Sequence, residues 1–163
     1  AAWATKPGQC QWMAYGDSVV FHYSHQTRLL EHSFTRLADF SNPPRLISCK
    51  DPLEEEGFRS GIFHLDKTSV VFAASDALSH YVLMMYELSK RSEFERELME
   101  LRTKPTSNSQ LLQMAEKEEL NFYDDVLIPL IRSAESESAF KELMETLYAK
   151  RLIDIDDYTL AIL

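Results

Sequence analysis

The sequence predicts an α+β fold in which mainly antiparallel β-sheet layers pack against helices. Short apolar runs separated by turn residues fill the chain up to about residue 74, and apolar residues recur at helical spacing from about residue 75 onward. Residues 158–163 then return to a strand-like pattern. Strands followed by helices, instead of alternating with them, are typical of the α+β class. With 163 residues, the chain is expected to form one domain over residues 1–163.

Two β-hairpins are expected in the first half of the chain. Residues 9–15 and 18–23 flank a turn that contains Gly16 and Asp17, and residues 60–65 and 68–74 flank a second short turn. The end of the last of these strands, residues 70–74, contains no polar residue. We therefore expect that strand to be central and covered on both faces.

Helices are expected from residue 75 to residue 152. One apolar stripe recurs at helical spacing after residue 75, at Leu78, Tyr81, Val82, Met85 and Leu88. Residues 140–152 form the clearest amphipathic helix of the chain. The segment between these two helices, about residues 91–139, is expected to be a helical insertion.

Charge and cysteine content limit the classes of partner. The 17 Lys and Arg residues against 26 Asp and Glu residues give a formal net charge of −9, which argues against nucleic acid and against an anionic membrane as partners. Cys10 and Cys49 lack metal-ligand spacing and are too few for a secreted disulfide framework. With no secretory signal at its start, the chain is expected to be cytoplasmic.

Three acidic positions share one context, a turn next to a strand-like run. Asp17 lies in the first hairpin turn, Asp76 follows the apolar strand, and the pair Asp156 and Asp157 precedes the last strand. Carboxylates that converge from strand ends can hold hard divalent cations. Asp is also a common turn residue and is favoured at helix N-termini, so a purely structural role stays open for each position.

These acidic positions lie in three motifs that together resemble the type-2C, metal-dependent protein phosphatase family. The motifs are Gly16-Asp17-Ser18, the run VFAASDAL at residues 71–78, and DDYTL at residues 156–160. Family members carry a GDS turn, a strand that ends in ASDG, and a C-terminal DN-x-T that enters the last strand. The match is closest to a divergent bacterial branch in which SDG becomes SDA, and it covers about residues 9–90 and 140–163. The resemblance implies an αββα sandwich, of which this chain would form the C-terminal portion.

The resemblance also implies a metal site and a reaction. Asp76 and Asp156 match ligands of the family's paired metal site, with Asp157 as a neighbouring alternative to Asp156, and Asp17 matches a carboxylate near an additional metal position. Two Mn²⁺ or Mg²⁺ ions would activate a water that attacks the phosphorus of a phosphoserine or phosphothreonine protein. His80 stands where many members have another acid.

Part of the family's site has no counterpart in this sequence. The phosphate-binding Arg and the metal-bridging Asp-Gly motif of the N-terminal strands are missing, and no Asp-Gly dipeptide occurs in the chain. Two functions therefore stay open: a phosphatase domain represented by its C-terminal part, or a catalytically inactive phosphatase-like module for protein interaction or regulation. The sequence itself supports no serine–histidine–acid triad, and His22 and His25 are expected to face opposite sides of a strand.

Overall fold

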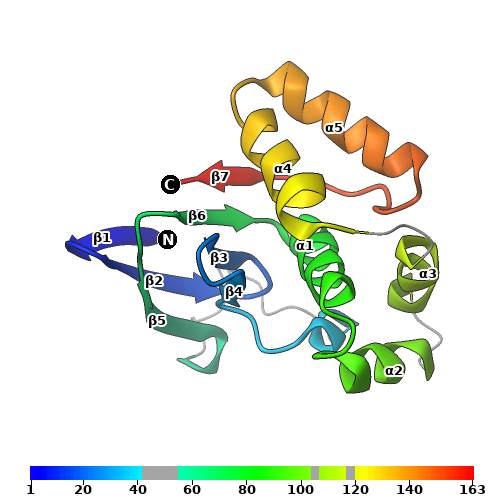
Figure 1. Cartoon of the computed structure of the whole chain (residues 1–163), viewed down its shortest axis with the longest axis horizontal. Helices are drawn as coiled ribbons and strands as arrows, with labels where there is room; N and C mark the ends of the chain where they lie inside the picture. The colour runs from blue at the N-terminus through cyan, green and yellow to red at the C-terminus, as the bar shows by residue number, and fades with distance from the viewer. Residues whose placement is uncertain (42–54, 104–106, 117–119) are drawn as a thin grey trace.

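The computed structural model confirms the α+β class and describes residues 1–41, 55–103, 107–116 and 120–163. Cys49 and the Pro43-Pro44 pair lie outside these residues. Two antiparallel sheets pack face to face, and the helices gather beyond one of them (Figure 1). The strands are β1 (Ala2–Lys6), β2 (Gln9–Tyr15), β3 (Val19–Ser24), β4 (Leu29–His32), β5 (Phe58–His64), β6 (Ser69–Ala74) and β7 (Leu160–Ile162).

The helical part follows β6. Its α-helices are α1 (Asp76–Ser89), α2 (Glu95–Thr103), α3 (Ser107–Ala115), α4 (Ile128–Ser133) and α5 (Glu137–Ala149). A π-helical turn, η3 (Phe122–Leu127), leads into α4, and the short 3₁₀ turns η1 (Leu37–Ser41) and η2 (Glu55–Gly57) flank a part of the chain that is not described. The described residues between 91 and 139 are thus largely helical. Among all described helices, none is both long and apolar enough to cross a membrane.

Both predicted hairpins are wrong, although their strands exist. The order is β1-β2-β5 in one sheet and β4-β3-β6-β7 in the other, so β2 and β3 do not pair, and neither do β5 and β6. At each predicted hairpin the chain crosses from one sheet to the other. Gly16, in the first crossing, has a φ of 73°, a conformation that glycine adopts without the steric cost of a side chain.

Alternation along β3 and β6 separates two layers of core. Alternate residues of these strands face the helices, and the residues between them face the β1-β2-β5 sheet. The cluster between the sheets is formed by Cys10, Val20, Phe63 and Val71. The strand β6 lies between β3 and β7, which confirms the expected central strand with cover on both faces.

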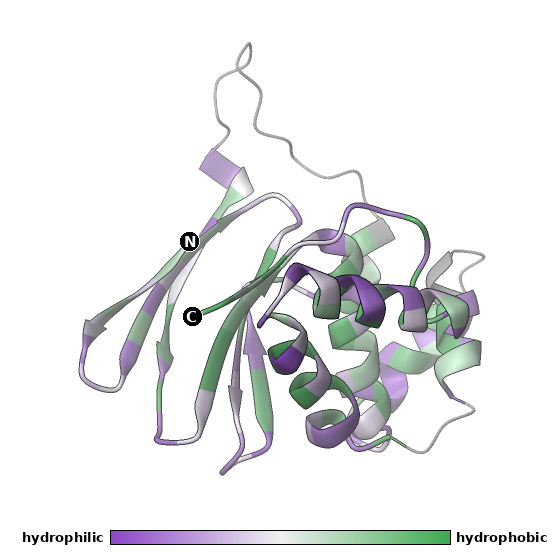
Figure 2. Cartoon of the chain, turned by 90° about the horizontal axis from the view of Figure 1, so that it is seen from above, coloured by the Kyte–Doolittle hydropathy of each residue, from purple (hydrophilic) through white to green (hydrophobic). Residues whose placement is uncertain are grey.

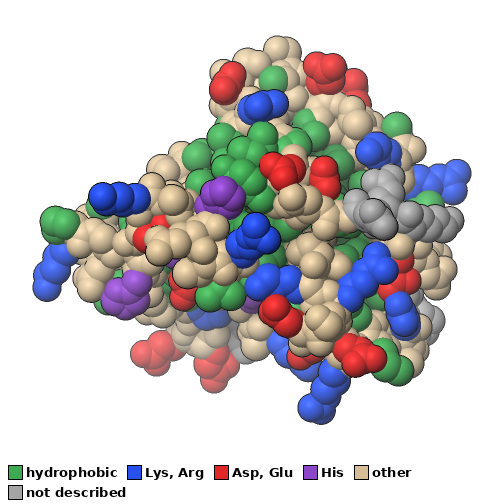
Figure 3. Space-filling view, in the orientation of Figure 1, with side chains coloured by type: hydrophobic (Ala, Val, Ile, Leu, Met, Phe, Trp, Pro, Cys, Tyr) green, Lys and Arg blue, Asp and Glu red, His purple; other side chains and the backbone are tan. Residues whose placement is uncertain are grey.

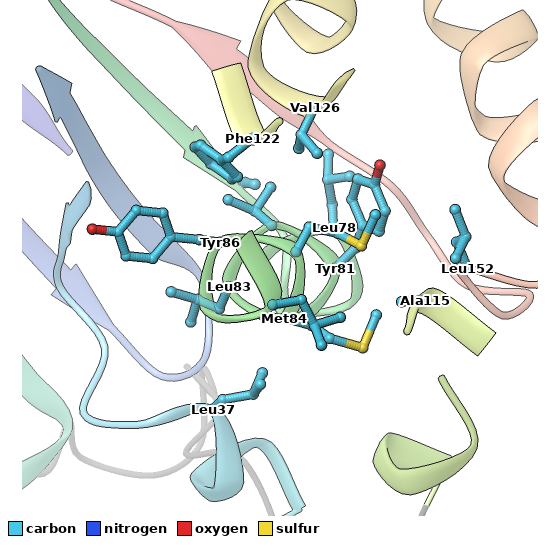
Figure 4. Close-up of a cluster of buried hydrophobic side chains, with 14 of the residues drawn as sticks. Leu37, Leu78, Tyr81, Leu83, Met84, Tyr86, Ala115, Phe122, Val126 and Leu152 are labelled. Carbon is cyan, nitrogen blue, oxygen red and sulfur yellow. The ribbon is translucent and has the colours of Figure 1, made fainter. Parts of the chain in front are cut away.

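The larger core surrounds α1. The expected stripe of α1 is buried, and so are the positions between its members, from Leu78 through Leu88. Figure 4 shows that side chains from α1, η1, α3 and η3 meet there, together with Leu152, which follows α5. Because α1 is covered from several sides, it is the central helix of the helical half. This packing holds the N-terminus of α1 in place at the end of β6.

Candidate functional site

Asp76 and Asp156 lie on neighbouring segments at one end of the four-stranded sheet. Asp76 is the first residue of α1, directly after β6. The backbone N–H of Ser75 donates to the carbonyl oxygen of Thr159 (3.1 Å), and the N–H of Thr159 donates to the hydroxyl oxygen of Ser75 (3.1 Å). These two hydrogen bonds extend the β6–β7 pairing and hold the segment of Asp156 next to the start of α1.

Asp17 reaches the same region from the crossing between β2 and β3. Burial raises the pKa of the Asp17 carboxyl, and the negative charges of Asp76 and Asp156 raise it further, against its own backbone N–H and the charge of Arg59. Asp17 therefore lies within electrostatic range of Asp76 and Asp156, the other two acidic positions that the sequence singles out.

The hydroxyl of Tyr158 is also affected by the negative charges of this region. Burial raises the pKa of its hydroxyl to about 12, and the charges of Asp156, Asp154 and Asp76 contribute in that order. The hydroxyl donates to the backbone carbonyl oxygen of Asp154, which closes the segment that leads into β7. Asp154 is thus a fourth carboxylate at this site, one that the sequence motifs do not mark.

A pocket of about 260 Å³ opens beside Asp76 and Asp156. Its lining also includes His80, one helical turn after Asp76 on the same face of α1. His80 is only 7% exposed, its Nε2 atom has no hydrogen-bond partner among the described residues, and burial lowers its pKa to about 4. The imidazole is therefore neutral at pH 7. Asp157 is not part of the pocket lining within the described residues, which favours Asp156 over its neighbour.

Arg59 on β5 is the basic residue that sequence reasoning missed. Its guanidinium lowers the pKa of Asp17, donates to the carbonyl oxygen of Gly16, and lies 4.7 Å from the centre of the Phe34 ring. Arg59 is far from Asp17 in sequence and no motif surrounds it. Only the pairing of Ala14 with Arg59 across β2 and β5 brings the guanidinium to this turn.

The donor chemistry of this site fits a hard divalent cation, because carboxylate oxygens are the ligands that Mg²⁺ and Mn²⁺ prefer. Among the described residues, however, no three His, Cys, Asp or Glu side chains are gathered closely enough to hold a metal ion. A cation here would thus take two of the carboxylates and keep most of its waters.

Comparison with known proteins adds no further assignment. No protein-family model, no curated protein and no solved structure matches this chain.

Proposed function

We propose that this chain is a metal-dependent protein phosphatase-like domain that acts on phosphoserine or phosphothreonine. The observation that carries the proposal is the pocket lined by both Asp76 and Asp156, whose negative charges also act on Asp17 from a third part of the sequence. Neighbouring carboxylates gain from a shared cation, because the cation removes their repulsion.

Each residue would have a distinct role. Asp76 and Asp156 would hold the cation, whose contribution would be to lower the pKa of a bound water and so supply the nucleophile. Asp17 would balance the charge of an additional, weaker cation position. Arg59 lies at the edge of the carboxylates, where its planar guanidinium can pair with phosphate oxygens.

The expected partner is a phosphorylated protein, and the expected location is the cytoplasm. The net charge of −9 makes nucleic acid and an anionic membrane unfavourable partners. On the face drawn in Figure 3, Lys and Arg side chains lie among Asp and Glu side chains instead of forming one basic patch.

An inactive interaction or regulatory module is the second candidate. It is favoured by the absence, within the described ranges, of three side chains gathered as a ready metal site. Both candidates share the fold, so they differ in one measurable property, the binding of a divalent cation by the carboxylates.

Titration calorimetry with Mn²⁺ separates the two candidates. We expect weak, saturable binding that is lost in Asp76→Asn and in Asp156→Asn, because each substitution keeps the size of the side chain and removes its charge. Asp157→Asn is the matched control and should bind like the wild type. Heat signals that do not saturate, or that survive in Asp76→Asn, contradict the metal site.

Phosphate release tests the reaction itself. We expect negligible release by the 163 residues alone, because two carboxylates leave the cation mostly hydrated. The native gene product is assayed on a phosphothreonine peptide with Mn²⁺ and with EDTA, and the Asp76→Asn form is the control. Equal rates with Mn²⁺ and with EDTA would overturn the phosphatase proposal and favour the interaction module.

A further inference from the structure

A serine, a histidine and a glutamate form a hydrogen-bonded chain on the inner face of the four-stranded sheet. The Oε2 atom of Glu31 lies 2.7 Å from Nδ1 of His22, and Nε2 of His22 lies 2.8 Å from the hydroxyl oxygen of Ser69. The three residues come from the adjacent strands β4, β3 and β6. These three hydrogen-bonded residues are separate from the carboxylates described above.

The register of the strands sets this arrangement. Glu31 is the direct cross-strand partner of His22, and Ser69 pairs with Ser24, two residues beyond His22 on the same face. Direct and diagonal neighbours on one face of an antiparallel sheet are within reach of long side chains. The arrangement therefore follows from the backbone pairing of β3 with β4 over four residues and with β6 over six residues.

The hydrogen-bond partners also fix the direction of each proton for a neutral imidazole. A carboxylate only accepts, so Nδ1 of His22 carries the hydrogen and donates to Glu31. Nε2 is then an acceptor, and the Ser69 hydroxyl donates to it. The Ser69 oxygen also accepts from the backbone N–H of Asp66 (2.8 Å), and the Asp66 carboxylate is a second acceptor near the Ser69 hydroxyl.

The three hydrogen-bonded residues differ in burial in a way that suits a reactive serine. The His22 side chain is 3% exposed and lies against the Phe63 ring, 5.4 Å between centres, whereas Glu31 is 53% exposed. Ser69 is partly exposed and follows the exposed Lys67 and Thr68. The base is thus shielded and oriented, and Ser69, the first residue of β6, is partly exposed.

We infer that Ser69 is a nucleophile that His22 activates and Glu31 orients, with small activated carboxylic esters as the substrate class. The Ser69 oxygen would attack the ester carbonyl carbon while its proton passes to Nε2 of His22. His22 would return that proton to the departing alkoxide, which leaves as an alcohol. Water, deprotonated by His22, would then cleave the acyl–serine bond and release the carboxylic acid and free Ser69.

Labelling with a fluorophosphonate, with the modified residue mapped by mass spectrometry, tests this inference. We expect a covalent adduct on Ser69 that forms without metal and in the presence of EDTA. The His22→Gln variant should label about 10²–10⁴-fold more slowly, the range for loss of a general base. Ser60→Ala, which removes an exposed serine of the other sheet, is the matched control and should label at the wild-type rate.

The result separates this inference from the phosphatase proposal. Asp76→Asn should leave labelling of Ser69 unchanged, so the loss of one activity does not imply loss of the other. If His22→Gln does not fold, Glu31→Gln, altered at a half-exposed position, provides the comparison and should also slow labelling. No adduct on Ser69 of the folded wild type, or equal rates in the wild type and the variants, would overturn the inference and leave the three residues a structural role.

Discussion

The two sheets of this protein differ in what covers their outer faces. The β4-β3-β6-β7 sheet is covered by the helical half, and Phe21 and Phe72 stack there, fully buried, at 4.8 Å between ring centres. The outer face of the β1-β2-β5 sheet points away from the helices (Figure 2). It carries large side chains that are 39–51% exposed: Trp3, Met13, Phe58 and Ile62. Apolar side chains on the two outer faces therefore contribute very differently to stability, although their sequences look alike.

The largest expected effect is the loss of a buried phenylalanine on the helix-covered sheet. Phe72→Ala should lower the free energy of unfolding by about 3–5 kcal/mol, because it opens a cavity in the main core. Phe58→Ala is the matched change on the other sheet and should cost about 1 kcal/mol, mainly for its edge contact with Tyr15. Urea unfolding of both variants gives the comparison, and similar costs would mean that the two faces are equally covered.

A second effect should appear in the pH dependence of stability. Glu87 of α1 is 7% exposed, Oε2 has no hydrogen-bond partner among the described residues, and burial raises its pKa to about 7. The folded state then binds more protons than the unfolded state between pH 4.5 and 7, so stability falls as pH rises through this window. The difference corresponds to about 3 kcal/mol above pH 7.

The Glu87→Gln variant should remove this pH dependence and be more stable than the wild type at pH 8. Glu142→Gln, a change at an exposed position of α5, is the control and should keep the wild-type profile. Thermal unfolding from pH 4 to pH 8 measures both variants. A wild-type profile in Glu87→Gln would show that water reaches this side of α1, and that the helical cover is less complete than the structure indicates.

A smaller effect concerns the junction between the sheets, where the chain crosses at Asp17. Asp76→Asn should lower the pKa of Asp17 toward its ordinary value, because the charge of Asp76 is the largest electrostatic cause of its elevation. Nuclear magnetic resonance titration of the Asp17 carboxyl carbon measures this change. Asp125→Asn, a change at an exposed position of η3, should leave the curve in place. If the titration curve of Asp17 is unchanged in Asp76→Asn, the charge of Asp76 does not act on Asp17, and Asp17 is not part of the site.

The smallest effect is expected on the surface of the helical half. Arg102 of α2 forms an ion pair with Glu116, next to α3, and the Arg102 side chain is half-exposed. Arg102→Met should change the free energy of unfolding by less than about 1 kcal/mol, since exposed ion pairs contribute little. Chemical denaturation in low and high salt measures this cost. A larger, salt-dependent loss would mean that charge, as well as apolar packing, holds α2 and α3 in place.

Most individual elements could be predicted from local patterns. The apolar run at residues 70–74 predicts a central strand, the stripe from Leu78 to Leu88 predicts α1, and both predictions are confirmed. The short edge strands β1 and β4 were missed. Their apolar alternation is weak, because no residue of β1 is fully buried and β4 buries Leu30 alone.

The sequence by itself determined most of the strands and helices, and three of the carboxylates that are candidates for a shared site. Hydrophobic periodicity and turn residues involve only a few neighbouring positions, so they can be recognised in the sequence. Only the tertiary structure decided that adjacent strands belong to different sheets. Whether a turn closes a hairpin or crosses between layers depends on the partners that bury each face. The same long-range pairing places Arg59 beside Asp17 and Ser69 beside His22, contacts to which no local pattern points.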